Sequence, residues 1–154
     1  MNIVVGYLPT PAGRAALRAG ITEATLRSAD LVVVQGHHAK RWGRHTGPED
    51  TEAAMKEDRA ALDESGVSYE LVPVAHDADP ADVILEATDR DRTALLVIGT
   101  RRRTPVGKLI MAPTTQRLLL EAGCPVLCVK AGYDAARVSD VDRFPSRASG
   151  PDGE

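Results

Sequence analysis

Ala94-Leu-Leu-Val-Ile-Gly-Thr-Arg-Arg-Arg-Thr-Pro-Val-Gly-Lys108 is the stretch of the chain that is most informative about the fold. It begins as an apolar run, which ends at Gly99, and continues as a basic loop punctuated by Gly and Pro. A helix is predicted to open at Pro113, and Pro125-Val-Leu-Cys-Val-Lys130 is typical of a further strand. In α/β folds, a strand followed by a loop and a helix N-terminus binds phosphate, because backbone N–H groups and the helix dipole converge there.

The rest of the sequence alternates apolar strand patterns with helical patterns. Strands are predicted at residues 2–7, 30–35, 68–74, 93–98 and 125–130, and helices at 11–27, 48–65, from 80 onward and at 114–122. Continuous apolar strands separated by helices predict a Rossmann-like α/β fold, a five-stranded doubly wound parallel sheet with helices on both faces. In the last helix, Leu118, Leu119 and Ala122 are predicted to face the sheet.

Length and composition indicate one ordinary globular domain. The chain has 154 residues, of which 43% are hydrophobic, 27% are charged and only 3% are aromatic. This balance suits helices packed on a sheet rich in Val and Leu, rather than an aromatic platform for nucleic acid. A net charge of −3 gives no general attraction to nucleic acid or to an anionic membrane surface. We therefore expect neither as a partner.

The sequence shows no targeting or membrane segment. No run reaches the length of a transmembrane helix, and residues 1–15 lack the pattern of a signal peptide. We therefore expect a cytoplasmic protein. Two cysteines, Cys124 and Cys128, are too few for a disulfide framework, and we expect both to be small buried side chains.

A ligand crevice is predicted where the strands end. In doubly wound sheets, ligands bind at the carboxyl ends of the strands, near the point where the strand order reverses. The loops after Val5, Val34 and Ile98 should therefore surround one crevice. Residues 1–130 are expected to form the domain, and residues 131–154 are polar and are expected to form a flexible tail.

Over roughly residues 2–130, the chain resembles the universal stress protein (UspA-like) family. The resemblance rests on Ile3-Val-Val-Gly-Tyr7, on Leu31-Val-Val-Val34, on the segment that starts at Leu95, and most specifically on Gln116-Arg-Leu-Leu-Leu-Glu-Ala-Gly-Cys-Pro-Val-Leu-Cys-Val-Lys130. It implies a domain of the adenine nucleotide alpha hydrolase-like type and a role in the stress response. It also implies a homodimer that pairs along the last strand, Val126–Lys130. Some family members bind ATP and others do not.

The family's nucleotide motif is only partly matched. Members that bind ATP are similar in carrying G-x-x-G-x9-G-[ST] after the fourth strand and an aspartate after the first. Gly99 matches the first glycine, whereas Arg102 and Ala112 occupy the other two glycine positions. Pro113 stands at the Ser/Thr position, and Leu8 stands at the aspartate position.

These departures predict a weakened phosphate site. Pro113 has no N–H, so one donor that could point at a phosphate is missing, although Thr114 and Thr115 keep theirs. Leu8 cannot accept a hydrogen bond from a ribose or an adenine amine. Each lost charge-assisted hydrogen bond costs about 1.5–3 kcal/mol, or roughly tenfold or more in affinity. The candidate nucleotide-binding residues are Leu8, Val34, Gly99, Arg101, Arg102, Gly107, Ala112, Thr114 and Thr115.

Three functions remain open at this point. The first is a homodimeric regulatory and binding module with a degenerate or weak site for ATP or another adenine nucleotide. The second is an ATP-binding member in which Arg101, Arg102 and their basic neighbours hold the phosphates. The third is a slow ATPase, for which Asp77 is the nearest candidate carboxylate. No nucleophile–base pair stands in a recognisable setting, so we do not expect an enzyme.

The histidine-rich loop at residues 36–47 gives no metal signal. His37, His38 and His45 do not have a standard ligand spacing, and no cysteine or acid lies in register with them. We expect this loop to border the crevice without holding a metal.

Overall fold

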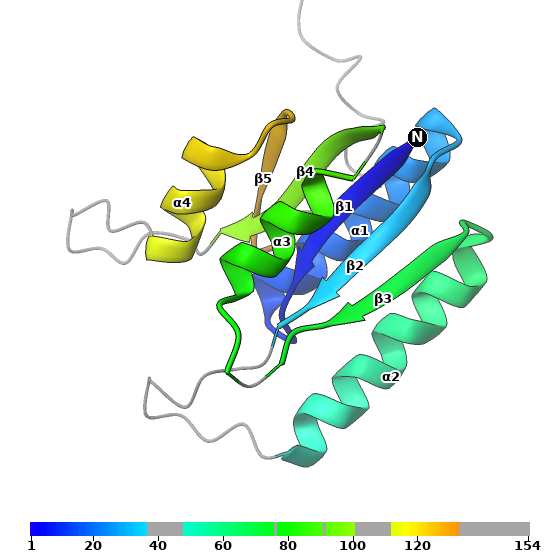
Figure 1. Cartoon of the computed structure of the whole chain (residues 1–154). Helices are drawn as coiled ribbons and strands as arrows, with labels where there is room; N and C mark the ends of the chain where they lie inside the picture. The colour runs from blue at the N-terminus through cyan, green and yellow to red at the C-terminus, as the bar shows by residue number, and fades with distance from the viewer. Residues whose placement is uncertain (37–47, 76, 91, 101–111, 133–154) are drawn as a thin grey trace, which may run out of the picture.

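A computed structural model describes residues 1–36, 48–75, 77–90, 92–100 and 112–132 of the chain (Figure 1). Strands and helices alternate throughout. Their bounds are β1 (Asn2–Tyr7), α1 (Pro11–Arg27), β2 (Asp30–Gln35), α2 (Pro48–Ser65), β3 (Tyr69–Pro73), α3 (Pro80–Thr88), β4 (Thr93–Thr100), α4 (Pro113–Glu121) and β5 (Val126–Lys130).

The strands form one parallel sheet in the order β3-β2-β1-β4-β5. Helices α1 and α2 cover one face of it, while α3 and α4 cover the other (Figure 1). The predicted five-stranded doubly wound sheet is confirmed. Because β1 and β4 are neighbours, the chain reverses its direction of travel across the sheet between these two strands, which makes their carboxyl ends the switch point.

Side chains along β1 alternate between the two faces of the sheet, and the core has one layer on each face. Ile3, Val5 and Tyr7 pack with the α1 and α2 layer, whereas Val4 packs with the α3 and α4 layer. Successive side chains of a strand point to opposite faces, so a run that is apolar at almost every position serves both layers. Ile3, Val4 and Val5 are accordingly fully buried.

The helix ends lie where the sequence places them. The Gly13 N–H donates to Oγ1 of Thr10 at 3.0 Å, and the Ala81 N–H donates to Oδ1 of Asp79 at 2.9 Å. These are N-caps, and each is followed by proline at the first helical position. Helix α2 ends at Ser65 before Gly66, which has a φ of +69° that glycine adopts without strain.

The strand bounds shift slightly from the prediction. β4 runs two residues beyond the predicted end, because Gly99 and Thr100 continue the ladder opposite Val129 and Lys130. β3 is shorter at both ends, spanning Tyr69–Pro73. A partner strand decides how far a ladder continues, and the local apolar run does not contain that information.

One prediction about α4 is wrong. Leu118 is buried and Ala122 is half-buried against the same core layer, as expected, but Leu119 is 38% exposed. Residues 118 and 122 share a helix face, whereas residue 119 lies about 100° around the helix. Leu120 is 85% exposed, so α4 touches the core with a narrow stripe.

Candidate functional site

The carboxyl ends of β1, β2 and β4 lie side by side. Gly6 pairs with Val34 on one side and with Ile98 on the other, so the three strands end in near register. The sheet thereby brings Leu8, Val34 and Gly99 to one edge, at the predicted crevice. Val34 as a whole residue is only 1% exposed and packs in the α3 and α4 layer, so its side chain is not available to a ligand.

Gly99 has a packing role that sequence reasoning missed. A Cβ at Gly99 would lie closer than 3.0 Å to the carbonyl carbon and oxygen of Ala12, in the first turn of α1. That distance is one that real Cβ atoms essentially never show. The end of β4 and the start of α1 therefore meet backbone to backbone, and glycine is required there whether or not a phosphate binds.

Leu8 follows β1 directly and presents no acceptor side chain. It is 38% exposed, and its carbonyl oxygen accepts a hydrogen bond from the Thr10 N–H at 2.7 Å. Its side chain lies beside Gly36 at the end of β2, where a Cβ would approach the Leu8 Cδ2 to 2.8 Å. A ligand bound beside residue 8 would therefore meet an aliphatic group.

The start of α4 offers backbone N–H groups without a side-chain cap. Ala112 is the N-cap residue, with φ −57° and ψ 141°, and its methyl group makes no capping hydrogen bond. Pro113 follows as the first helical residue, and the first helical hydrogen bond runs from the Gln116 N–H to the Ala112 carbonyl at 3.0 Å. The N–H groups of Thr114 and Thr115 therefore point out of the helix end, which favours an anion.

Some predicted residues lie outside the part of the chain that the structure describes. These are Arg101, Arg102 and Gly107 of the basic loop and the three histidines at 37, 38 and 45. Among the described residues, no three His, Cys, Asp or Glu side chains gather into a metal site. None of the described helices combines the length and the apolar character that a membrane span needs.

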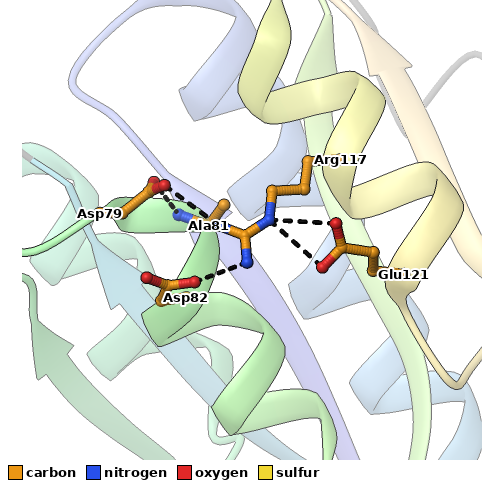
Figure 2. A network of polar contacts seen from close by, with 5 residues as sticks. All are labelled: Asp79, Ala81, Asp82, Arg117 and Glu121. Carbon is orange, nitrogen blue, oxygen red and sulfur yellow. Dashed lines mark hydrogen bonds and ion pairs between the residues drawn. The ribbon is translucent and has the colours of Figure 1, made fainter.

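An ion-pair cluster, which sequence reasoning missed, joins α3 to α4. Figure 2 shows Arg117 of α4 between Asp79 and Asp82 of α3 and Glu121 of its own helix. The three ion pairs measure 3.1, 2.7 and 3.1 Å. The carboxylates raise the pKa of the Arg117 guanidinium above its ordinary value. The largest cause is the hydrogen bond to Glu121, and the hydrogen bond to Asp82 comes next. The spacing of Arg117 and Glu121 is a readable sequence signal, but the contact across helices is not.

A second polar cluster lies under α2. The Tyr7 hydroxyl donates to Oδ2 of Asp58 at 2.5 Å, and Nε of Arg14 lies 3.3 Å from the same oxygen. Burial raises the pKa of Tyr7 well above its ordinary value, and the hydrogen bond to the Asp58 carboxylate adds to this effect. A cavity of about 340 Å³ adjoins the cluster, between α2 and the ends of β1 and β2. The cluster holds α2 against the first turn of α1.

The two cysteines differ in exposure. Cys124 is half-buried, whereas Cys128 is exposed, so the prediction that both are buried is wrong for Cys128. Successive residues of β5 point to opposite faces of the sheet, so Cys128 lies on the face opposite the buried Val129, where α4 covers the sheet with only a narrow stripe. Partial burial raises the pKa of both thiols above the ordinary value.

The fold defines a class: a single α/β domain of the adenine nucleotide alpha hydrolase-like type. The universal stress protein family model matches residues 1–130, and the chain belongs to this family. A universal stress protein of Mycolicibacterium smegmatis is 42% identical over 134 residues, which cover 83% of this chain and 96% of that protein.

Solved structures share the architecture. A universal stress protein from Archaeoglobus fulgidus is 28% identical with a TM-score of 0.64, over 84% of this chain and 98% of that one. The structure of the protein from Archaeoglobus fulgidus in complex with dAMP has 24% identity and a TM-score of 0.59, over 84% and 98%. A universal stress protein in complex with cAMP has 20% identity and a TM-score of 0.60, over 85% and 97%.

Proposed function

We propose that this universal stress protein is a homodimeric regulatory module of the cytoplasm that binds an adenine nucleotide weakly. The nucleotide would bind in the predicted crevice at the carboxyl ends of β1, β2 and β4. The observation that carries the proposal is the convergence of the ends of β1, β2 and β4 at the switch point, the place where this class of fold binds ligands. The dAMP and cAMP complexes of proteins with this fold support the choice of ligand class.

Weak binding follows from what borders the crevice. Leu8 offers an aliphatic side chain where a ligand's hydroxyl or amine would need an acceptor. At the start of α4, Pro113 removes one donor and Ala112 supplies no polar side chain. The N–H groups of Thr114 and Thr115 remain to contact a single phosphoryl group. Two donors can serve one phosphoryl group but not three, so the site suits an adenosine monophosphate better than ATP.

Calorimetric titration with AMP, cAMP and ATP tests this proposal, together with one gain-of-function variant. We expect wild-type dissociation constants above about 10 µM and an AMP affinity roughly tenfold higher in Leu8→Asp, because the new carboxylate adds one charge-assisted hydrogen bond. Leu8 is 38% exposed, so the folded domain tolerates the charge.

Leu26→Asp is the matched control. Leu26 is 75% exposed and lies near the other end of α1, so the same chemical change there should leave AMP affinity within about twofold. Submicromolar ATP binding by the wild type would contradict a degenerate site. Equal gains in AMP affinity in Leu8→Asp and Leu26→Asp would show that the nucleotide does not bind beside residue 8.

The dimer is proposed to form along β5. This strand is an edge of the described sheet, and it exposes Leu127 and Cys128, an apolar edge that soluble proteins protect. A two-fold axis perpendicular to the sheet would pair β5 with its copy in antiparallel orientation. With the five residues Val126–Lys130 fully overlapped, Cys128 lies opposite its own copy.

Oxidative cross-linking tests this register. Directly opposed residues of antiparallel strands have Cα atoms about 4.5–5.5 Å apart, which a disulfide can bridge. We expect mild oxidation in alkaline buffer, where the thiols with raised pKa ionise, to give a covalent dimer in the wild type and in Cys124→Ser. Cys128→Ser should stay a 16.4 kDa species on a non-reducing gel. A 16.4 kDa particle in light scattering at micromolar concentration would reject the dimer.

A further inference from the structure

Helix α4 is held to the domain by few contacts. Among its described residues only Leu118 is buried, while Leu119 and Leu120 are exposed. The main polar connection to the rest of the domain is the Arg117 side chain, which reaches α3 in Figure 2. The place of α4 along the sheet therefore depends on a narrow apolar stripe, Leu118 with the half-buried Ala122, and on one guanidinium group.

Helix α3 is by contrast firmly anchored. Ala81, Ile84 and Ala87 are buried against the sheet, and Asp79 caps the helix through the Ala81 N–H. The two carboxylates that Arg117 contacts, Asp79 and Asp82, lie at the N-cap and in the first turn of α3. Arg117 thus connects α4 to the part of α3 that lies nearest the carboxyl ends of the strands.

Arg117 is also close to the start of its own helix. Arg117 follows Thr114 by three residues and Thr115 by two, so less than one helical turn separates it from the free N–H groups at the start of α4. Glu121, one turn further on, contacts Nε at 3.1 and 3.2 Å and limits the orientations of the guanidinium group. The remaining nitrogens, Nη1 and Nη2, face Asp79 and Asp82.

We propose that Arg117 is a positioning residue for the phosphate of the bound nucleotide. Its ion pairs with α3 hold the Thr114 and Thr115 N–H groups at the crevice, while Arg117 itself does not touch the ligand. This inference rests on the proposed function, since it needs a nucleotide whose phosphate meets α4. The ion-pair cluster around Arg117 thereby has a role in binding, although exposed ion pairs contribute little to the free energy of unfolding.

The first experiment compares adenosine with AMP by calorimetric titration. In Arg117→Gln, we expect AMP affinity to fall about tenfold and adenosine affinity to change less than about twofold, because only the phosphate contacts lose their geometry. Arg117→Lys should recover most of the loss. Arg90→Gln, which breaks the exposed pair of Arg90 with Glu70 at 2.8 Å, is the matched control and should leave both affinities unchanged.

A second variant separates positioning from simple charge attraction. The double change Asp79→Asn with Asp82→Asn breaks the bridge and removes two negative charges, while asparagine at 79 still caps α3. Loss of positioning predicts weaker AMP binding in this variant, whereas charge alone predicts tighter binding. Tighter or unchanged AMP binding would overturn the inference.

Hydrogen exchange of the ligand-free protein tests the same point without a nucleotide. Amides of α4 should exchange at least about fivefold faster in Arg117→Gln than in the wild type, while amides of β1 and β4 keep their protection. Unchanged exchange in α4 would overturn the inference even if nucleotides bind. If wild-type protein binds neither AMP nor adenosine, the proposed function fails, and faster exchange would then show only that Arg117 anchors α4.

Discussion

Gly99→Ala is expected to lower the free energy of unfolding by about 3 kcal/mol, a loss large enough to unfold a marginal domain. The added Cβ would lie closer than 3.0 Å to backbone atoms of Ala12, and backbone cannot move aside as the end of a side chain can. Relief requires α1 to move away from β4, which separates buried residues on both elements. Urea unfolding followed by circular dichroism measures the loss.

Gly123→Ala is the matched control for that substitution. A Cβ at Gly123 would meet no atom within 4 Å, so the same added methyl group should change stability by less than about 0.5 kcal/mol. Equal stabilities of Gly99→Ala and Gly123→Ala would refute the close backbone approach. The unfolding data also show how a binding experiment on Gly99→Ala should be interpreted. If this variant fails to bind nucleotide, the cause is loss of the fold rather than loss of a phosphate contact.

Asp58→Ala should have a comparably large effect, a loss of about 3 kcal/mol. The Asp58 side chain is only 12% exposed, and its Oδ2 accepts from the Tyr7 hydroxyl and pairs with Arg14. Its removal leaves a buried hydroxyl without its acceptor and an arginine, 31% exposed, without its nearest carboxylate. Urea unfolding again supplies the measurement.

The chain offers a matched control for this prediction as well. Asp63 accepts a hydrogen bond from the Tyr69 hydroxyl at 2.5 Å, the same length as the bond between Tyr7 and Asp58, but its surroundings are exposed. Asp63→Ala should therefore cost less than about 1 kcal/mol. A double-mutant cycle with Tyr7→Phe should show coupling of at least about 1 kcal/mol between Tyr7 and Asp58. Additive effects would mean that the pair does not hold α2 in place.

Much of the architecture can be predicted from local patterns. The strands at residues 2–7 and 30–35 and the caps at Thr10 and Asp79 are confirmed with their bounds, because apolar runs, N-cap residues and proline act over a few neighbours. The parallel doubly wound class follows from element order, since parallel strands need helical crossovers. The family resemblance is likewise carried by contiguous motifs.

Other features depend on residues far apart in the chain. The strict need for glycine at position 99 comes from Ala12, eighty-seven residues earlier, and the buried carboxylate of Asp58 has its partners in β1 and α1. Arg117 finds Asp79 only because α3 and α4 pack side by side on one face of the sheet. Close approach and paired charge are properties of three-dimensional neighbours, whereas helices, strands and turns follow from the stereochemistry of adjacent residues. The elements and their order are therefore determined by the amino-acid sequence, whereas the packing of distant segments decides which side chains meet beneath and between the helices.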